Sequence, residues 1–221
     1  MRIARLAPSR RVWIFDLDNT LHDATAAIFP AMHLQINDFL KRHFGLDDEG
    51  ANRMRRDFWL RYGTTLNGLM RHYGMDPKRF LAETHVFPEL AELVVHENAL
   101  RHALERLGGM KLVFSNAPRQ YVRGVLAAIG LARYFDGVYS IEDARYRGKP
   151  ALHGFHVLLR KHNLDPHRCA FVDDIVENLR TAHRLGMSTV WVSRSSRRRA
   201  PFVDLRISSV LELPRLVFRY G

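Results

Sequence analysis

The chain of 221 residues has a single cysteine, Cys169, and no long hydrophobic run. One thiol cannot form an intrachain disulfide, and it cannot supply the set of cysteines that holds a structural zinc ion. No stretch of about 18 apolar residues is present, and the basic first residues, Met1 to Pro8, lack the apolar segment of a signal sequence. We therefore expect a cytoplasmic protein with no membrane partner.

Acidic residues are in the minority. The 23 aspartates and glutamates stand against 34 lysines and arginines, which gives a formal net charge of +11. A positive excess favours anionic partners, either phosphorylated small molecules or nucleic acid. Most arginines are scattered through the predicted helices, which is typical of a solvated surface, and one cluster, Arg194 to Arg199, is expected in an exposed loop. No aromatic residue interleaves with that cluster, so it lacks a stacking platform for single-stranded nucleic acid, and a nucleic-acid partner is possible but not the expected one.

A short apolar run, Val12 to Phe15, ends in two aspartates, Asp16 and Asp18, followed by Thr20. The aromatic and β-branched residues of the run predict a buried strand, and open α/β sheets bind their ligands at the carboxyl ends of such strands. An Asp-x-Asp pattern alone is commonest in solvated turns and helix caps. Two acids in one site must share a cation or hold different protonation states, because like charges raise one pKa.

Three further groups of polar residues follow along the chain, each at a predicted strand end or in a tight turn. They are Ser115-Asn116 after the apolar run Lys111 to Phe114, Lys149 between Gly148 and Pro150, and Asp173-Asp174 after the run Cys169 to Val172. Any one of these groups is unremarkable alone. Their joint occurrence, in this order, indicates a single site assembled at one edge of a sheet.

The segment from residue 23 to 97 is patterned for helices throughout. Apolar residues recur at helical spacing in four stretches, Ala26 to Leu40, Met54 to Leu60, Leu66 to Tyr73 and Phe80 to Phe87. No strand-like run of useful length interrupts them. Apolar residues make up 47% of the chain, which is enough to bury one core domain and an insertion. We expect residues 23–97 to form a second, smaller, all-helical domain.

From residue 98 onward, predicted helices and strands alternate with short connections. Further strands are expected at Val138 to Ser140, Thr189 to Val192 and Leu205 to Ile207, and a weak closing helix at Val210 to Val217. Such alternation predicts a parallel sheet with helices on both faces. The expected fold class is α/β, with a Rossmann-like core of residues 1–22 and 98–221.

The sequence Asp16-Leu17-Asp18-Asn19-Thr20-Leu21, together with the three later polar groups, resembles the motifs of the haloacid dehalogenase superfamily. Most members of that superfamily are Mg²⁺-dependent phosphatases that work through an aspartyl-phosphate. The resemblance implies that residues 1–22 and 98–221 form the catalytic core. It also implies that residues 23–97 form a helical cap that closes over the catalytic edge of the sheet.

The resemblance implies a role for each residue of the motifs. Asp16 is expected to be the nucleophile, and Asp18 the general acid and base. Ser115 and the backbone N–H of Asn116 are expected to donate hydrogen bonds to the phosphoryl oxygens, while Lys149 offsets the charge of the nucleophile and the phosphate.

Magnesium is the expected cofactor, since Mg²⁺ prefers oxygen ligands and offsets phosphate charge. By resemblance, the ion is held by the Asp16 carboxylate, the Asp18 backbone carbonyl and the later acid pair. Of that pair, Asp174 is the expected direct ligand, and Asp173 either ligates the ion or acts through water. Thr20 is expected to fix the loop through its hydroxyl, a role close to that of a helix cap.

The segment Tyr62-Gly63-Thr64-Thr65-Leu66-Asn67-Gly68-Leu69, with Phe171 to Asp174 and Leu185-Gly186-Met187, looks like the pyrimidine 5′-nucleotidase branch of the superfamily. The implied substrate is a nucleoside monophosphate such as UMP or CMP. The residues expected to bind the substrate are Tyr62, Thr64, Thr65 and Asn67 in the cap, and Asn19, Thr20 and Asn116 in the core.

Two features of the sequence leave alternatives to the nucleotidase interpretation open. Thr64 or Thr65 can instead cap a helix, with Tyr62 packed inside the cap domain. His22 stands where the nucleotidase branch usually carries a tyrosine after Asn-Thr-Leu. A phosphatase of a sugar phosphate or of phosphoglycolate is therefore an alternative function.

Two further alternatives fit the sequence less well. A haloacid dehalogenase shares the nucleophilic aspartate, but it uses no metal and needs no second acid two residues later, so Asp18 and the Asp173-Asp174 pair argue against it. A basic nucleic-acid-binding protein on this scaffold explains the charge, but such a protein is expected to have lost some of the catalytic acids. None of them is lost here.

Overall fold

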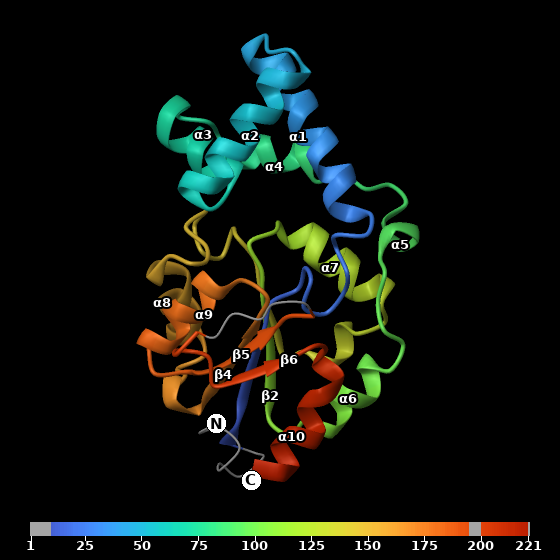
Figure 1. The fold of residues 1–221 in the computed structure, drawn as a ribbon, viewed down its shortest axis with the longest axis vertical. Coiled ribbons are helices and arrows are strands. Elements are labelled where there is room, and N and C mark those ends of the chain that lie inside the picture. The colour runs from blue at the N-terminus through green and yellow to red at the C-terminus, as the bar shows by residue number, and fades with distance from the viewer. Residues whose placement is uncertain (1–9, 195–199, 221) are drawn as a thin grey trace. The chain divides into compact units, whose positions relative to one another are not determined.

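The computed structural model describes residues 10–194 and 200–220, and the basic cluster expected after Arg194 lies outside the described residues (Figure 1). The chain divides into two compact units, one of residues 1–24 and 94–221 and the other of residues 25–93. These boundaries differ from residues 22 and 98 because the backbone N–H of Asp23 donates to the carbonyl of Val95 at 2.7 Å. Asp23 and Val95 therefore both belong to the larger unit.

The larger unit contains a six-stranded sheet in the order β3-β2-β1-β4-β5-β6, in which every neighbouring pair is parallel. The strands are β1 (Val12–Phe15), β2 (Met110–Phe114), β3 (Gly137–Tyr139), β4 (Cys169–Asp173), β5 (Ser188–Val192) and β6 (Leu205–Ile207). The predicted parallel sheet is confirmed. β1, β4 and β5 are buried at every residue, as expected of strands covered on both faces.

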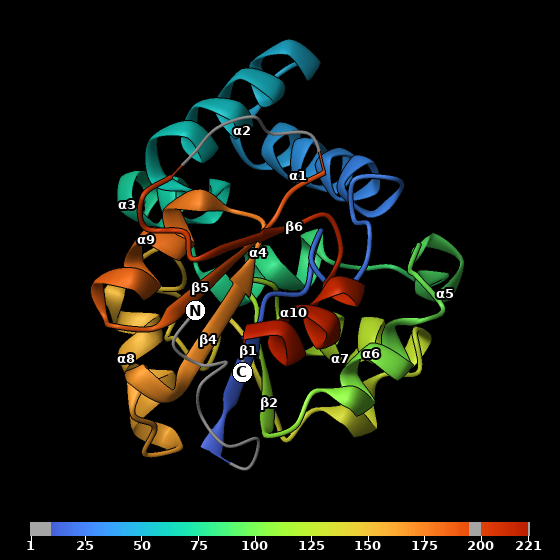
Figure 2. The same ribbon diagram turned by 60° about the horizontal axis from the view of Figure 1, so that its bottom comes forward.

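Helices cover both faces of this sheet. Figure 2 shows α8 and α9 on one side, and α6 and α7 on the other. The helices of this unit are α6 (Leu100–Arg106), α7 (Arg119–Ala128), α8 (Leu152–Lys161), α9 (Val176–Arg184) and α10 (Leu213–Tyr220), with short 3₁₀ turns at Ala132–Tyr134, Pro166–Arg168 and Val210–Glu212. The predicted closing helix is therefore a 3₁₀ turn followed by α10. Among the described residues, no helix combines the length and the apolar character needed to cross a membrane.

Side chains of β1 alternate between the two faces, as the two-residue period of a strand requires. Val12 and Ile14 join an apolar cluster with Phe155 of α8 and Phe171 of β4. Trp13 is fully buried, and its indole N–H donates to the carbonyl of Gly108 at 3.1 Å. Each large side chain buried here contributes on the order of 1.5–3 kcal/mol, so the centre of the sheet is a rigid support for the residues at its edge.

The smaller unit, residues 25–93, is built from helices only, and the structure describes all of it. Its helices are α1 (Ile28–Phe44), α2 (Asp48–Tyr62), α3 (Thr65–Tyr73), α4 (Pro77–Thr84) and α5 (Leu90–Leu93). Phe39 of α1 packs edge-on against Phe80 of α4, with ring centroids 5.1 Å apart. α2 and α3 approach so closely that a Cβ atom on Gly68 would lie 2.3 Å from the Phe58 ring. Glycine is therefore required at this position.

Candidate active site

The carboxyl ends of three neighbouring strands bring the four predicted motifs together. β1 lies between β2 and β4, so Asp16, Ser115 and Asp173 end adjacent strands at one edge of the sheet. The backbone N–H of Asp16 donates to the carbonyl of Val172 at 2.8 Å, which extends the β1–β4 ladder to the acids. Strand register therefore fixes the spacing of these side chains.

Lys149 lies between two of the aspartates and is almost completely buried. Its ammonium nitrogen donates to Asp16 Oδ1 at 2.6 Å and to Asp173 Oδ2 at 2.8 Å. The same nitrogen lies over the rings of Phe114 and Phe171, at 5.3 and 5.4 Å from their centroids. Burial by itself lowers the pKa of Lys149, but the two carboxylates more than offset this effect and hold the pKa above its ordinary value. The side chain is therefore a permanent cation.

The three acids form a group of oxygen ligands. Asp16, Asp173 and Asp174 each offer a carboxylate oxygen, and these oxygens lie within 4.8 Å of one another. Burial raises the pKa of Asp16 well above its ordinary value; the charge of Lys149 opposes this shift, and the nearby acids add to it. Burial and the charge of Asp173 raise the pKa of Asp174 to about 7. The cluster is thus short of positive charge, and its hard oxygen donors suit Mg²⁺.

The two acids of the later pair have different surroundings. Asp173 is fully buried, and its carboxylate accepts hydrogen bonds from Lys149, from the Asn178 amide and from the backbone N–H of Ile175. Asp174 is partly exposed. The acceptor positions of Asp173 are largely occupied by the protein, so this arrangement favours Asp174 as the acid that meets a cation directly.

Ser115 and Asn116 follow β2 and shape the loop that carries Lys149. The Asn116 amide donates to the Lys149 carbonyl and accepts from the Lys149 N–H, each at 2.8 Å. A Cβ atom on Gly148 would lie 2.1 Å from Asn116 Oδ1, so only glycine allows this approach. The buried Ser115 hydroxyl accepts from the backbone N–H of Ala117 at 3.0 Å, which leaves its own proton available to a ligand.

The turn after β1 carries Asn19 and Thr20, and it differs from the expectation at the Thr20 hydroxyl. Asn19 has a left-handed backbone with φ of 57°, and its side-chain oxygen accepts from the backbone N–H of Ala24 at 3.1 Å. Asn19 therefore shapes the turn. The Thr20 hydroxyl is buried and has no hydrogen-bond partner within the described part of the chain, so it does not fix the loop as expected.

Two residues that the sequence analysis did not assign to the site contact Asp18. His22 Nε2 lies 2.8 Å from Asp18 Oδ1, and the Tyr121 hydroxyl donates to the same oxygen at 2.7 Å. The sequence singled out His22 only as a departure from a related branch. Tyr121 lies 103 residues from Asp18, next to the apolar Val122, and its position on α7 is that of an ordinary core residue.

The residues expected to bind a nucleotide have hydrogen-bond partners within the helical unit. Thr64 caps α3, since its side chain accepts from the backbone N–H of Asn67 at 3.0 Å, and the Asn67 amide donates to the Tyr62 carbonyl at 3.0 Å. The buried Thr65 hydroxyl donates to the Arg55 carbonyl at 3.3 Å. The Tyr62 hydroxyl lies 2.5 Å from His72 Nε2. These contacts correspond to the capping alternative for this segment.

Comparison with known proteins identifies the class to which this fold and site belong. A family model described as haloacid dehalogenase-like hydrolase matches residues 11–186. The match covers more than half of the chain, so the chain belongs to this family of hydrolases, as the motifs predicted.

One curated protein with a related sequence is a yeast protein. The chain is 26% identical over 200 residues to phosphate metabolism protein 8 of Saccharomyces cerevisiae, and the match covers 83% of this chain and 61% of that protein. The chain thus spans less than two thirds of that relative.

Two solved structures share the fold. A HAD phosphatase from Thermococcus onnurineus superposes with a TM-score of 0.68 at 23% identity, over 94% of this chain and 97% of that one. An L-2-haloacid dehalogenase from Xanthobacter autotrophicus superposes with a TM-score of 0.62 at 17% identity, over 94% and 98%. Phosphatase and dehalogenase share the fold, so the choice between them depends on the residues of the site.

Proposed function

We propose that this chain is a Mg²⁺-dependent phosphomonoester hydrolase that acts through an aspartyl-phosphate on Asp16. The observation that carries the proposal is the contact of Lys149 with Asp16 and Asp173, at 2.6 and 2.8 Å, at a strand edge that also holds Asp18 and Asp174. A dehalogenase requires the nucleophile but not the additional acids. A dianionic phosphate ester requires both the cation and a proton donor.

The residues of the site supply each part of the reaction. An Asp16 oxygen attacks phosphorus, the bond from phosphorus to the ester oxygen breaks, and Asp18 gives its proton to the leaving alkoxide. Water then attacks the phosphoryl group, Asp18 takes a proton from it, and inorganic phosphate leaves a free Asp16. Ser115 and the backbone N–H of Asn116 donate to the phosphoryl oxygens during both steps.

The chemistry of the acid cluster fits a magnesium ion. Asp16 and Asp174 would hold it, with the Asp18 backbone carbonyl, while Asp173 holds Lys149. When bound, Mg²⁺ neutralises charge on the phosphoryl oxygens so that a carboxylate can approach phosphorus. Lys149 offsets charge on Asp16, through its contact with that carboxylate. The unbalanced negative charge of the cluster supports this part of the proposal.

The substrate we infer is a nucleoside 5′-monophosphate, with a sugar phosphate or phosphoglycolate as the second candidate. The resemblance of residues 62–69 and 171–174 to the pyrimidine 5′-nucleotidase branch supports the nucleotide. The formal charge of +11 is consistent with any of these anions. The side chains of Tyr62, Thr64, Thr65 and Asn67 all have contacts within the helical unit, so the proposal of a nucleotide rests on the resemblance of this segment and not on the positions of these side chains.

A phosphate-release screen tests this proposal. Pyrimidine and purine monophosphates, sugar phosphates and phosphoglycolate are incubated with the protein in Mg²⁺ and in EDTA, and halide release from 2-chloropropionate is measured in parallel. We expect Mg²⁺-dependent phosphate release, fastest from UMP or CMP, and no halide. A preference of more than tenfold for phosphoglycolate or a sugar phosphate would overturn the nucleotidase assignment alone. Full activity in EDTA would overturn the phosphatase assignment as well.

Single substitutions of the later acids separate their roles. We expect Asp174→Asn to raise the Mg²⁺ concentration needed for half-maximal activity by about tenfold or more, because a direct ligand is lost. Asp173→Asn should instead lower the melting temperature, because the fully buried Asp173 carboxylate accepts from the Asn178 amide and the Ile175 N–H as well as from Lys149. Magnesium titrations and thermal unfolding of both variants measure these effects. A larger change in the Mg²⁺ requirement for Asp173→Asn would reverse the assignment.

A further inference from the structure

Among the described residues, the carboxyl group of Asp18 is contacted at one oxygen only. His22 Nε2 and the Tyr121 hydroxyl both meet Oδ1, at 2.8 and 2.7 Å, and neither contacts Oδ2. The His22 side chain is fully buried and Tyr121 is 3% exposed, whereas the Asp18 side chain is 17% exposed. A general acid must present one oxygen to its substrate. The protein thus distinguishes the two oxygens of this carboxyl group.

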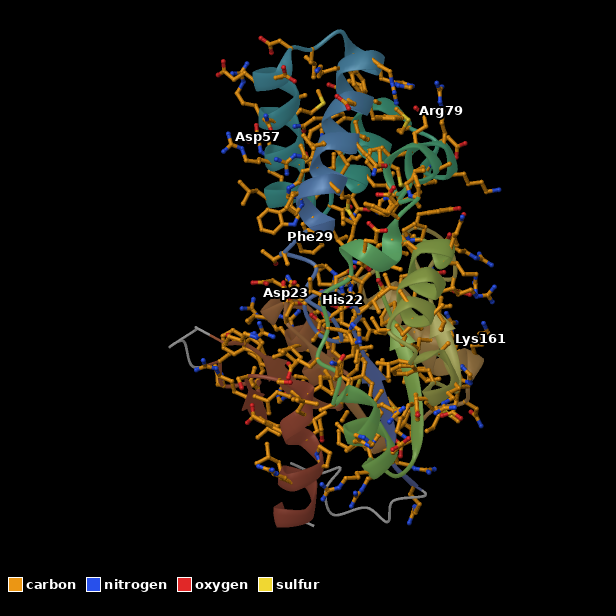
Figure 3. The ribbon with its side chains drawn as sticks, turned by 90° about the vertical axis from the view of Figure 1, so that its right-hand side faces the viewer. His22, Asp23, Phe29, Asp57, Arg79 and Lys161 are labelled. Carbon is orange, nitrogen blue, oxygen red and sulfur yellow. The ribbon has the colours of Figure 1, made fainter. Side chains whose placement is uncertain are left out.

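The two partners are held by different parts of the fold. His22 lies on the segment after β1, next to Asp23 (Figure 3), and the turn before it is closed by the backbone bond from Leu21 N–H to the Leu17 carbonyl at 2.8 Å. Tyr121 lies in the first turn of α7, a helix whose buried side chains face the sheet. Two rigid elements therefore converge on one oxygen atom.

The geometry of both partners suits a donor role. The Tyr121 hydroxyl is buried and donates to Asp18 Oδ1. His22 Nδ1 is buried and has no hydrogen-bond partner among the described residues. An unpartnered acceptor nitrogen is less costly than an unpartnered N–H, so a ring with its proton on Nε2, which donates to Asp18, fits this environment.

We propose that His22 and Tyr121 are positioning residues that hold Asp18 Oδ1 and direct Oδ2, with its proton, toward the ester oxygen of the substrate. The inference rests on the proposed phosphatase function. In the branch that this chain resembles, a tyrosine usually occupies position 22. Here a histidine occupies that position, and the tyrosine hydroxyl reaches the carboxyl group from α7.

Leaving-group dependence tests this role. Alkyl phosphates release a strongly basic alkoxide that needs the proton of Asp18, whereas p-nitrophenyl phosphate releases a weakly basic phenolate that does not. We expect Tyr121→Phe to lower kcat/KM by about tenfold or more for the alkyl ester that the wild type cleaves fastest, and by less than about threefold for p-nitrophenyl phosphate. For His22→Leu we expect the same difference, a larger fall in kcat/KM for the alkyl ester than for p-nitrophenyl phosphate. His22→Gln keeps a donor amide and should recover part of the kcat/KM lost for the alkyl ester.

Tyr139→Phe is the matched control, because its buried hydroxyl has no hydrogen-bond partner in the described structure. We expect this variant to cleave both esters at the wild-type rates. Thermal unfolding of every variant reports folding separately. Equal losses for both esters, or no loss for either, in folded Tyr121→Phe and His22→Leu would overturn the positioning role while the phosphatase assignment stands. A wild-type protein that cleaves neither ester would overturn the phosphatase assignment, and with it the positioning role.

Discussion

Replacement of Asp16 by asparagine will abolish turnover and leave the fold intact. An amide oxygen is a poor nucleophile toward phosphorus and a weaker ligand for Mg²⁺, so we expect kcat to fall by at least about a thousandfold. The fold should survive because Lys149 keeps its contact with Asp173 at 2.8 Å. Phosphate release and single-turnover formation of the phosphoenzyme are the measurements.

Asp57→Asn is the control for this substitution, since it makes the same chemical change on an exposed residue of α2 and is expected to retain full activity. Thermal unfolding should give similar melting temperatures for both variants and the wild type. Residual activity of folded Asp16→Asn above about a thousandth of the wild type would contradict nucleophilic catalysis by Asp16.

Replacement of Lys149 by methionine will destabilise the protein as well as inactivate it. The substitution keeps an unbranched side chain but leaves Asp16 and Asp173 buried without their shared cation. We expect the free energy of unfolding to fall by about 3–5 kcal/mol, which is the typical cost of removing one partner of a buried ion pair. Urea unfolding without divalent cations measures this loss, and added Mg²⁺ should recover part of it by supplying positive charge to the same acids.

Lys161→Met provides the comparison. Lys161 is half exposed, with 55% of its side chain accessible, and its nearest acid, Asp143, lies 3.6 Å away. Such surface pairs contribute about 0–1 kcal/mol, so this variant should unfold close to the wild type. If Lys149→Met cost no more than Lys161→Met, Lys149 would not be the cation that balances the acids.

Most of the site was predicted from short patterns in the sequence, namely apolar runs that end in polar residues. Asp16, Ser115 and Asp173 each follow an apolar run, and apolar runs identify strands without knowledge of their neighbours. The parallel topology then follows from the alternation of strands with helices, because a crossover returns each new strand in the same direction. The sheet edge and its motif residues were therefore predictable from the order of residues along the chain.

Those short patterns could not predict which side chains contact each other between distant segments of the chain. The sequence analysis gave no role to the Asn116 side-chain amide, which binds the main chain of Lys149, 33 residues away. The Thr20 hydroxyl was expected to fix its loop, yet it has no partner among the described residues. Side-chain hydrogen bonds depend on distance and direction in space, and sequence spacing sets neither across a turn or a crossover.

The sequence by itself determined the fold class, the family and the edge of the sheet at which the acids gather, because periodicity and strand-end motifs are properties of short segments. Only the tertiary structure decided which acid holds Lys149 and which oxygen of Asp18 is bound. The partners that decide these points, Asn178 for Asp173 and Tyr121 for Asp18, reach their acids from helices α9 and α7. Their positions follow from how those helices pack against the sheet, and packing is a property of the whole folded unit.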